Sequence, residues 1–259
     1  MNSFPQELRD KVFGYISPDD KETLRNCSLV AKSWKHTSQK RLFESVKTPP
    51  GNLQLWLERA SRENVALLEH VRNLTCFQES CTVWSIDPAL KTPLNNLQFL
   101  GQLRHFNLGF TDISSPPEIG SFKPALSCLT LTYCGISTDT LVAFINYFPD
   151  LEYLHLESLT CPVPKVPQTY LVPRPPLKQL YTDEGLESEK YLDLLDELSK
   201  LGLRFDQVFL KPTFRSYHSV NRVVRAFGAG TKYLRLPQIP CGMGDLFHSS
   251  MVSLFIILS

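Results

Sequence analysis

The segment LSCLTLTYCGI, residues Leu126 to Ile136, decides the expected fold. Its apolar residues follow the order L-x-x-L-x-L-x-x-C-x-I, in which Leu129 and Leu131 are separated by a single residue. Alternation with a period of two places such side chains on one face of a strand and the intervening residues on the other face. The pattern therefore predicts a short strand with one buried leucine face, followed by a turn that Cys134 closes.

The same order of apolar residues recurs along much of the chain. The middle apolar positions of the copies are Leu74, Phe106, Leu129, Leu154, Leu180, Val208, Leu234 and Leu254. Most steps between them fall in the window of roughly 20–29 residues that is typical of leucine-rich repeats. The first step is longer and leaves room for an insertion around residues 80–92. This repetition predicts a stack of similar units over residues 71–259.

Helical patterns lie between the predicted strands. Apolar residues spaced three and four apart cover one face of residues 141–148, 191–198 and 220–227. Ser137 or Asp139 lies near the start of the first pattern, and Gly202 occupies the C-cap position after the second. One strand and one helix per unit predict a curved α/β solenoid, with the strands lining its concave side.

The first residues follow a different pattern. The segment FPQELRDKVFGYISPDDKETLRNCSLVAKSWKHTSQKRLFESV, residues 4–46, predicts three short helices. Leu8, Val12 and Ile16 share one face of the first helix, and the residues SPDD at 17–20 end that helix and cap the next. A second stripe consists of Leu24, Cys27, Ala31 and Trp34. So small a helical unit cannot bury all its apolar side chains, so some must pack on the rest of the chain or on another protein.

The composition is that of an ordinary globular chain. The 259 residues are 42% hydrophobic and 20% charged, with a formal net charge of +1, which disfavours a nucleic-acid or a polybasic membrane surface. The start of the chain carries no signal-peptide pattern, and the apolar end MVSLFIILS is far shorter than the ~20 residues of a membrane span. Seven cysteines without a secretion signal indicate reduced thiols and a cytoplasmic or nuclear location. Because the chain stops in an apolar strand without a polar capping repeat, we expect a C-terminal truncation.

Motifs of catalysis and metal binding are missing from the sequence. The six histidines are scattered singly, and Cys76 and Cys81 have no second pair of ligands nearby in sequence. There is no nucleophile elbow, phosphate-binding loop or dinucleotide fingerprint. The acidic run from Asp183 to Glu189 is interpreted as a solvated loop that stabilises the start of the following helix. The sequence therefore predicts no catalytic residue, no metal, no cofactor and no enzymatic activity.

A proline-rich segment, CPVPKVPQTYLVPRPP at residues 161–176, admits two interpretations. Pro164 and Pro167 fit the spacing of a polyproline ligand. Alternatively, the segment is a stiff connector that replaces a helix on the convex side of one unit. The connector is the favoured interpretation.

The N-terminal segment resembles an F-box. The motif is carried by Phe4-Pro5-x-Glu7-Leu8, Val12-Phe13-x-x-Ile16, Leu24-x-x-Cys27-x-x-Val30-Ala31-Lys32-x-Trp34 and Arg41-Leu42-Phe43. The resemblance implies docking to a Skp-type adaptor, which links the chain to a cullin-RING ubiquitin ligase of the SCF type. Mapped from the family motif, the adaptor-binding residues are Phe4, Pro5, Leu8, Leu24, Val30, Lys32 and Trp34. The implied division is an F-box at residues 1–46, a helical linker at 47–70 and the repeats at 71–259.

Nearly the whole chain is similar to the F-box/leucine-rich-repeat proteins expanded in mushroom-forming fungi. Segments such as LTLTYCGISTDTLVAFINYFPDLEYLHLE (129–157) and VVRAFGAGTKYLRL (223–236) carry this likeness. It implies a substrate receptor whose repeats bind a protein target that the sequence does not identify. The alternative is a repeat scaffold that binds a protein without a ubiquitin role. On the concave face, the expected target-binding residues are Arg104, His105, Asn107, Thr130, Thr132, Glu152, His155 and Arg235.

Overall fold

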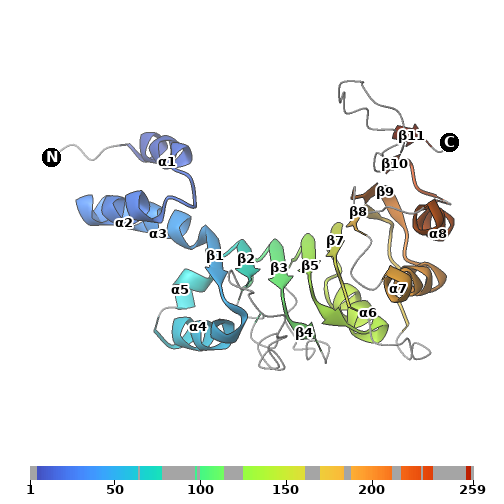
Figure 1. The fold of residues 1–259 in the computed structure, drawn as a ribbon. Coiled ribbons are helices and arrows are strands. Elements are labelled where there is room, and N and C mark those ends of the chain that lie inside the picture. The colour runs from blue at the N-terminus through green and yellow to red at the C-terminus, as the bar shows by residue number, and fades with distance from the viewer. Residues whose placement is uncertain are drawn as a thin grey trace, which may run out of the picture.

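The structure is a computed structural model that describes residues 5–63, 65–77, 97, 100–113, 125–160, 170–183, 188–211, 217–228, 230–235 and 255–257. Over these residues the chain is an α/β protein built on one long, mostly parallel sheet. Three helices precede the sheet and project beyond its first strand (Figure 1).

The N-terminal helices are α1 (Gln6–Tyr15), α2 (Lys21–Val30) and α3 (Lys32–Glu44). The predicted cap of the second helix is confirmed, because Asp20 Oδ1 accepts a hydrogen bond from the Thr23 N–H at 3.1 Å. The uninterrupted stripe expected from Leu24 to Trp34 is wrong. Ala31 has extended backbone with φ of −156°, so α2 ends at Val30 and Trp34 belongs to α3.

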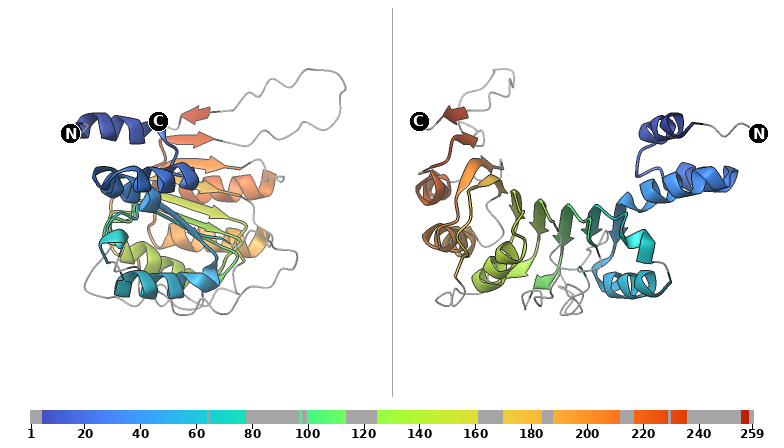
Figure 2. Two further views of the ribbon diagram at one scale, coloured as in Figure 1. Left: turned by 90° about the vertical axis from the view of Figure 1, so that its left-hand side faces the viewer. Right: turned by 180° about the vertical axis from the view of Figure 1, so that it is seen from behind.

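The sheet follows the order of the sequence. Its strands are β1 (Ser45–Thr48), β2 (Asn73–Cys76), β3 (His105–Gly109), β5 (Cys128–Thr132), β7 (Tyr153–Glu157), β8 (Leu177–Thr182), β9 (Phe205–Leu210), β10 (Tyr233–Arg235) and β11 (Phe255–Ile257). Neighbouring strands are parallel from β1 to β10, and β11 is antiparallel to β10. Two short strands, β4 (Asp112–Ile113) and β6 (Gly135–Ile136), form a separate parallel pair. The long sheet bends as an arc (Figures 1 and 2).

The register of the sheet confirms the predicted repeat positions from Leu74 to Leu234. In successive strand pairs, these positions lie directly opposite one another in the order Leu74, Phe106, Leu129, Leu154, Leu180, Val208 and Leu234. The structure adds Val46 of β1 opposite Leu74, so the expected boundary at residue 46 falls inside a strand. At the other end, the predicted position Leu254 lies outside the described residues, and the described strand beside it, β11, is antiparallel to β10 with Ile256 opposite Leu234.

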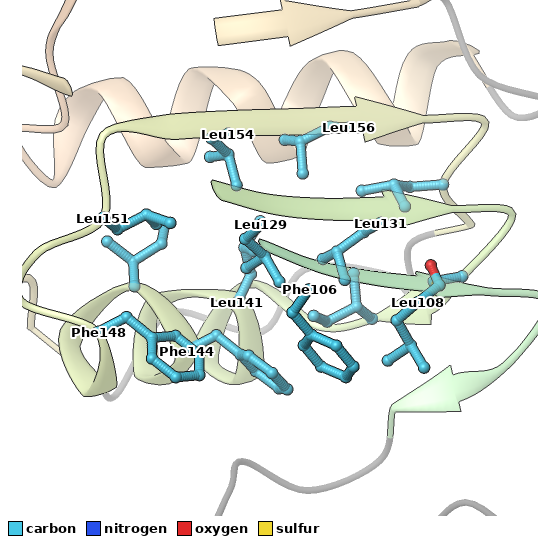
Figure 3. Packing of buried hydrophobic residues seen from close by; sticks show 14 of the residues in the cluster. Phe106, Leu108, Leu129, Leu131, Leu141, Phe144, Phe148, Leu151, Leu154 and Leu156 are labelled. Atoms are coloured by element: carbon cyan, nitrogen blue, oxygen red, sulfur yellow. The ribbon is translucent and has the colours of Figure 1, made fainter. Parts of the chain in front are cut away.

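Helices cover one side of the sheet and leave the other side open (Figures 1 and 2). They are α4 (Pro50–Glu63), α5 (Val65–Leu68), α6 (Thr138–Tyr147), α7 (Ser188–Lys200) and α8 (Tyr217–Phe227). The last three correspond to the helical patterns expected at 141–148, 191–198 and 220–227, except that α6 ends at Tyr147 with Phe148 as its C-cap. Gly202 after α7 has the positive φ of 96° that a C-cap glycine adopts. Figure 3 shows strand leucines such as Leu129 and Leu154 pointing toward Leu141, Phe144 and Phe148 around α6. These side chains belong to one continuous apolar core.

A repeated turn ends three of the strands. Phe110, Tyr133 and Ser158 follow β3, β5 and β7 directly, and each has a left-handed backbone with φ of 55°, 53° and 48°. In the second of these turns, the Cys134 Sγ–H donates to the Leu108 carbonyl oxygen at 3.3 Å. This agrees with the expected role of Cys134 in closing the turn.

The described part of the proline-rich segment, residues 170–176, acts as a connector. The Arg174 guanidinium donates to the carbonyl oxygens of Ile145 at 3.0 Å and Leu151 at 2.6 Å, which bracket the C-terminal end of α6. The first bond satisfies a carbonyl group that the last turn of α6 leaves without an intrahelical partner, and the second fixes the chain that leads into β7. The Pro164 and Pro167 pair lies outside the described residues.

Candidate functional site

Large apolar side chains are exposed on α1 and α2. We call the set formed by Leu8, Val12, Tyr15, Leu29 and Val30 the helical patch. The exposed fraction of the side chains reaches 45% at Leu8, 69% at Val30 and 91% at Tyr15. Leu8, Val12 and Tyr15 are spaced four and three apart, so they lie on one face of α1.

Both parts of the helical patch lie on helices that pack on α3. The Arg9 guanidinium of α1 donates to the Ser33 carbonyl oxygen at the start of α3. The first half of α1 therefore lies beside the corner where α2 meets α3. Leu8 precedes Arg9 in α1, and Val30 is the last residue of α2, shortly before Ser33 in the chain.

The helices beneath the patch are held by a small aromatic and cationic framework. The Phe13 and Trp34 rings meet edge to face, with centroids 5.6 Å apart. Arg41 donates to the Phe13 carbonyl oxygen at 3.4 Å and pairs with Glu44 at 2.7 Å. The Lys21 ammonium donates to the carbonyl oxygens of Leu42 and Ser45 at 2.7 and 2.8 Å, although its burial lowers the pKa of Lys21. The framework thus connects all three helices to the first residue of β1.

The predicted adaptor-binding residues differ in how far they are exposed. Pro5, Leu8, Val30 and Lys32 are exposed, and Trp34 is half-buried against Phe13. Leu24 is wholly buried, so it supports the helices and offers no surface to a partner. Phe4 lies outside the described residues.

Three members of the helical patch were missed. Val12 and Leu29 are among the apolar side chains that so small a helical unit is not expected to bury, but the family motif assigns neither to the adaptor, and Tyr15 carries no prediction. The signal was present for α1, because Leu8, Val12 and Tyr15 follow helical spacing. Phe13, not this stripe, supplies the buried side chain of α1.

Trp34→Ala is expected to loosen α1 from α3 at a cost of about 2 kcal/mol, below the range for a fully buried tryptophan because Trp34 is half-buried. Hydrogen exchange of the α1 backbone amides, measured on the whole chain, should become faster while exchange in β5 and β7 stays unchanged. Equal acceleration in both regions would contradict a local role for Trp34.

The second candidate surface is the open side of the sheet, called the open face. One cross-strand row consists of Asn73, His105, Cys128, Tyr153, Gln179, Gln207 and Tyr233. The next row consists of Thr75, Asn107, Thr130, His155, Tyr181, Phe209 and Arg235. In both rows, β2 to β5 contribute mainly small polar side chains, and β7 to β10 contribute most of the aromatic ones.

The aromatic half of the open face contains a contact between two rings and a pocket. The rings of His155 and Tyr181 lie 5.5 Å apart, and burial lowers the pKa of His155. A pocket of about 290 Å³ follows, lined by Gln207, Phe209, Tyr233 and Arg235. Aromatic side chains beside one arginine are the residue types that most often anchor a protein partner.

Only some of the predicted target-binding residues lie on the open face. His105, Asn107, Thr130, His155 and Arg235 lie together on the open face. The other three do not belong to its exposed centre. Thr132 is buried, Arg104 precedes β3 and donates to the Ala125 carbonyl oxygen at 3.1 Å, and Glu152 precedes β7 and pairs with Lys178 at 2.8 Å.

Much of the aromatic half was not predicted from the sequence, notably Tyr153, Tyr181, Gln207, Phe209 and Tyr233. The alternation that identified His105 and Thr130 also applies to the weaker copies at 177–180 and 205–210. Applied there, it would have identified Tyr181 and Phe209.

The described residues offer little support for a metal-binding or membrane-spanning role. Among them, no group of three or more His, Cys, Asp or Glu side chains is arranged to hold a metal ion, and no helix is long and apolar enough to span a membrane. Burial raises the pKa of the Cys76 and Cys134 thiols to about 12, so both stay protonated near neutral pH. The sequence matches no protein-family model and no curated protein.

Proposed function

We propose that this chain is the substrate-recognition subunit of an SCF-type cullin-RING ubiquitin ligase. Residues 1–46 would be an F-box that docks to a Skp-type adaptor, and residues 71–259 an irregular leucine-rich-repeat solenoid that binds a protein target. The observation that carries the proposal is the helical patch. Its large apolar side chains are exposed on helices that project beyond the sheet (Figure 1).

An apolar patch on a projecting element favours a protein partner. Contiguous exposed apolar surface with a polar rim is typical of interaction sites. Lys32 and Arg9 supply part of such a rim beside Val30 and Leu8. The Phe13–Trp34 contact and the Lys21 bonds fix the helices in place, so little ordering would be required on binding.

The proposed activity requires no chemistry from this chain. An adaptor held by the helical patch and a target held by the open face would share one molecule, which raises their effective concentration. Partner enzymes then make the new bond, and proximity supplies the rate increase. Lys21 of α2 bonds to Ser45 of β1, and β1 pairs with β2, so the N-terminal helices are connected to the sheet that carries the open face.

The deciding experiment is reconstitution with purified partners. We expect the full chain to form a one-to-one complex with a Skp-type adaptor and to recruit a cullin through it, measured by size-exclusion chromatography with light scattering. If the folded chain forms no complex with the adaptor or the cullin, the result would favour the alternative, a leucine-rich-repeat scaffold without a ubiquitin role.

Target binding should depend on the aromatic half of the open face. Tyr181→Ala together with Phe209→Ala is expected to reduce target capture at least about tenfold, because interface anchors are concentrated in aromatic residues. Adaptor binding should be unchanged. The readout is quantitative affinity mass spectrometry with the proteasome blocked.

The matched control is Thr75→Ala with Thr130→Ala, which alters the same row in the polar half. Equal loss of the target in both variants would contradict the assignment to the aromatic half.

A further inference from the structure

A basic pocket lies where the N-terminal helices meet the sheet, apart from the helical patch and the open face. It has a volume of about 490 Å³ and is lined by His36, Lys40, Glu69, His70, Arg72, Gly101 and Gln102. Three elements supply the lining, since α3 carries the first two, the turn between α5 and β2 the next three, and the residues before β3 the last two.

Four cationic or protonatable groups converge on this pocket. The imidazole rings of His36 and His70 lie with centroids 5.5 Å apart. Lys40 follows His36 by four residues, so both occupy the same face of α3. Arg72 is the last residue of the turn that precedes β2.

Among the described residues, few carboxylates oppose these groups. Glu69 lines the pocket, and the Glu44 carboxylate lies 3.9 Å from the Arg72 guanidinium while also pairing with Arg41 at 2.7 Å. Lys40 and Arg72 therefore balance the nearby carboxylates while the histidines are neutral. Each histidine that gains a proton adds an uncompensated positive charge.

The surroundings of His70 disfavour its protonated form. Burial lowers the pKa of His70, the charges of His36 and Lys40 lower it further, and Glu69 raises it. An anion in the pocket would reverse the unfavourable contributions of His36 and Lys40. Anion binding and histidine protonation should therefore reinforce one another.

We propose that this pocket binds the phosphate group of a phosphomonoester between His36 and His70, with Lys40 and Arg72 as counter-charges. A dianion with several acceptor oxygens matches two imidazole donors, an ammonium and a guanidinium. The volume exceeds that of a phosphate alone, so the pocket has room for part of the group that carries the phosphate. Lys40 and Arg72 would repel a metal cation at the same place.

Binding should depend on pH. Burial lowers the pKa of His70 in the empty pocket, and a bound dianion favours its protonated form, so binding should take up a proton that is scarcer at pH 8 than at pH 6.5. Over this range most of a phosphomonoester keeps its second charge, whose pKa is about 6. Among the described residues, the charged groups that face the histidines are Lys40 on α3 and both Glu69 and Arg72 in the turn between α5 and β2. Affinity should therefore increase as the pH falls from 8 to 6.5.

The test is isothermal titration calorimetry of the full chain with O-phosphoserine and, separately, with inorganic phosphate. We expect O-phosphoserine to bind at least about tenfold more tightly at pH 6.5 than at pH 8.0, with net proton uptake revealed by buffers of different ionisation enthalpy. Binding by inorganic phosphate of equal strength would identify the free ion as a sufficient ligand. Weaker binding by inorganic phosphate would assign part of the affinity to the carrier group.

Substitutions inside and outside the pocket test where the ligand binds. His70→Gln and Lys40→Gln are each expected to weaken binding at least about tenfold. Lys35→Gln, which removes a lysine of the same helix that does not line the pocket, should leave binding unchanged. Should a pocket variant fail to fold, the imidazole proton resonances of the parent chain provide a second measurement, because added O-phosphoserine should raise the pKa of His70.

No detectable binding by the parent chain, equal affinity at the two pH values, or undiminished affinity in folded His70→Gln and Lys40→Gln chains would overturn the proposal. The outcome is separate from the proposed ligase role, because adaptor docking involves the helical patch and is measured with purified adaptor.

Discussion

The double variant Leu8→Glu/Val30→Glu is expected to bind a Skp-type adaptor at least about 100-fold more weakly than the parent chain. Both side chains are exposed and border the contact between α1 and the start of α3. A complex that covers them would have to remove two carboxylates from water without providing partners for them. A 100-fold loss corresponds to about 2.7 kcal/mol, which is ordinary for substitutions at an interface centre.

The folded state should tolerate this change. Substitutions of exposed side chains usually alter stability by no more than about 0.5 kcal/mol. The matched control is Leu55→Glu/Val65→Glu, which places the same charges at exposed apolar positions of α4 and α5. Binding of purified adaptor, measured by calorimetry beside thermal unfolding, should be lost only in the first variant. Retained binding in that variant, or equal loss in the control, would refute docking through the helical patch.

The repeated strands could be predicted because their signal is local. A leucine at every second position, followed by a closing residue such as Cys134, specifies one buried face without knowledge of the neighbouring unit. The row from Leu74 to Leu234 then follows, because each unit repeats the same register. Stacking of units turns a local pattern into the long sheet.

The ends of the sheet could not be predicted in the same way. β1 is short, and Val46 is its only large apolar residue, so pairing with β2 rather than its own pattern defines it. The antiparallel direction of β11 likewise depends on where the chain returns, which no periodicity encodes. The break at Ala31 was hidden because the spacing of Leu24 and Trp34 continues a helical period across it.

Surfaces were predicted only in part for a related reason. Alternation along a strand identifies open-face residues such as His105 and His155, and helical spacing identifies one stripe of α1. The basic pocket depends on contacts between His36 and His70, which come from different elements. Such clusters require the fold before they can be recognised.

Asp183 is a case in which the sequence suggested a surface role and the structure shows a buried one. The acidic run that begins at Asp183 had been interpreted as a solvated loop, yet the exposed fraction of this residue is 4%. Its Oδ1 accepts a hydrogen bond from the Ser158 N–H at 2.6 Å, and its Oδ2 accepts one from the Ser158 hydroxyl at 3.0 Å. Of the same run, Glu189 does lie in the first turn of α7, as expected.

Asp183→Ala is therefore expected to lower the free energy of unfolding by about 3 kcal/mol. Two hydrogen bonds to a carboxylate are lost, and the Ser158 N–H remains buried without that acceptor. Ser158 also has the left-handed φ of 48°, a strained conformation that the Asp183 bonds help to hold. For a chain of this size the melting temperature should fall by about 6–12 °C. Thermal unfolding followed by circular dichroism measures the change.

Two further variants separate the carboxylate from the turn. Ser158→Ala removes only the hydroxyl bond and should cost about 1 kcal/mol, because its backbone N–H still reaches Asp183. Asp183→Asn keeps an oxygen that accepts from that N–H, so its effect should lie between the other two. A loss in Asp183→Ala no larger than in Ser158→Ala would show that the backbone bond contributes little. The turn after β7 would then be held by packing of the neighbouring units, since Leu159 beside it is buried in the core.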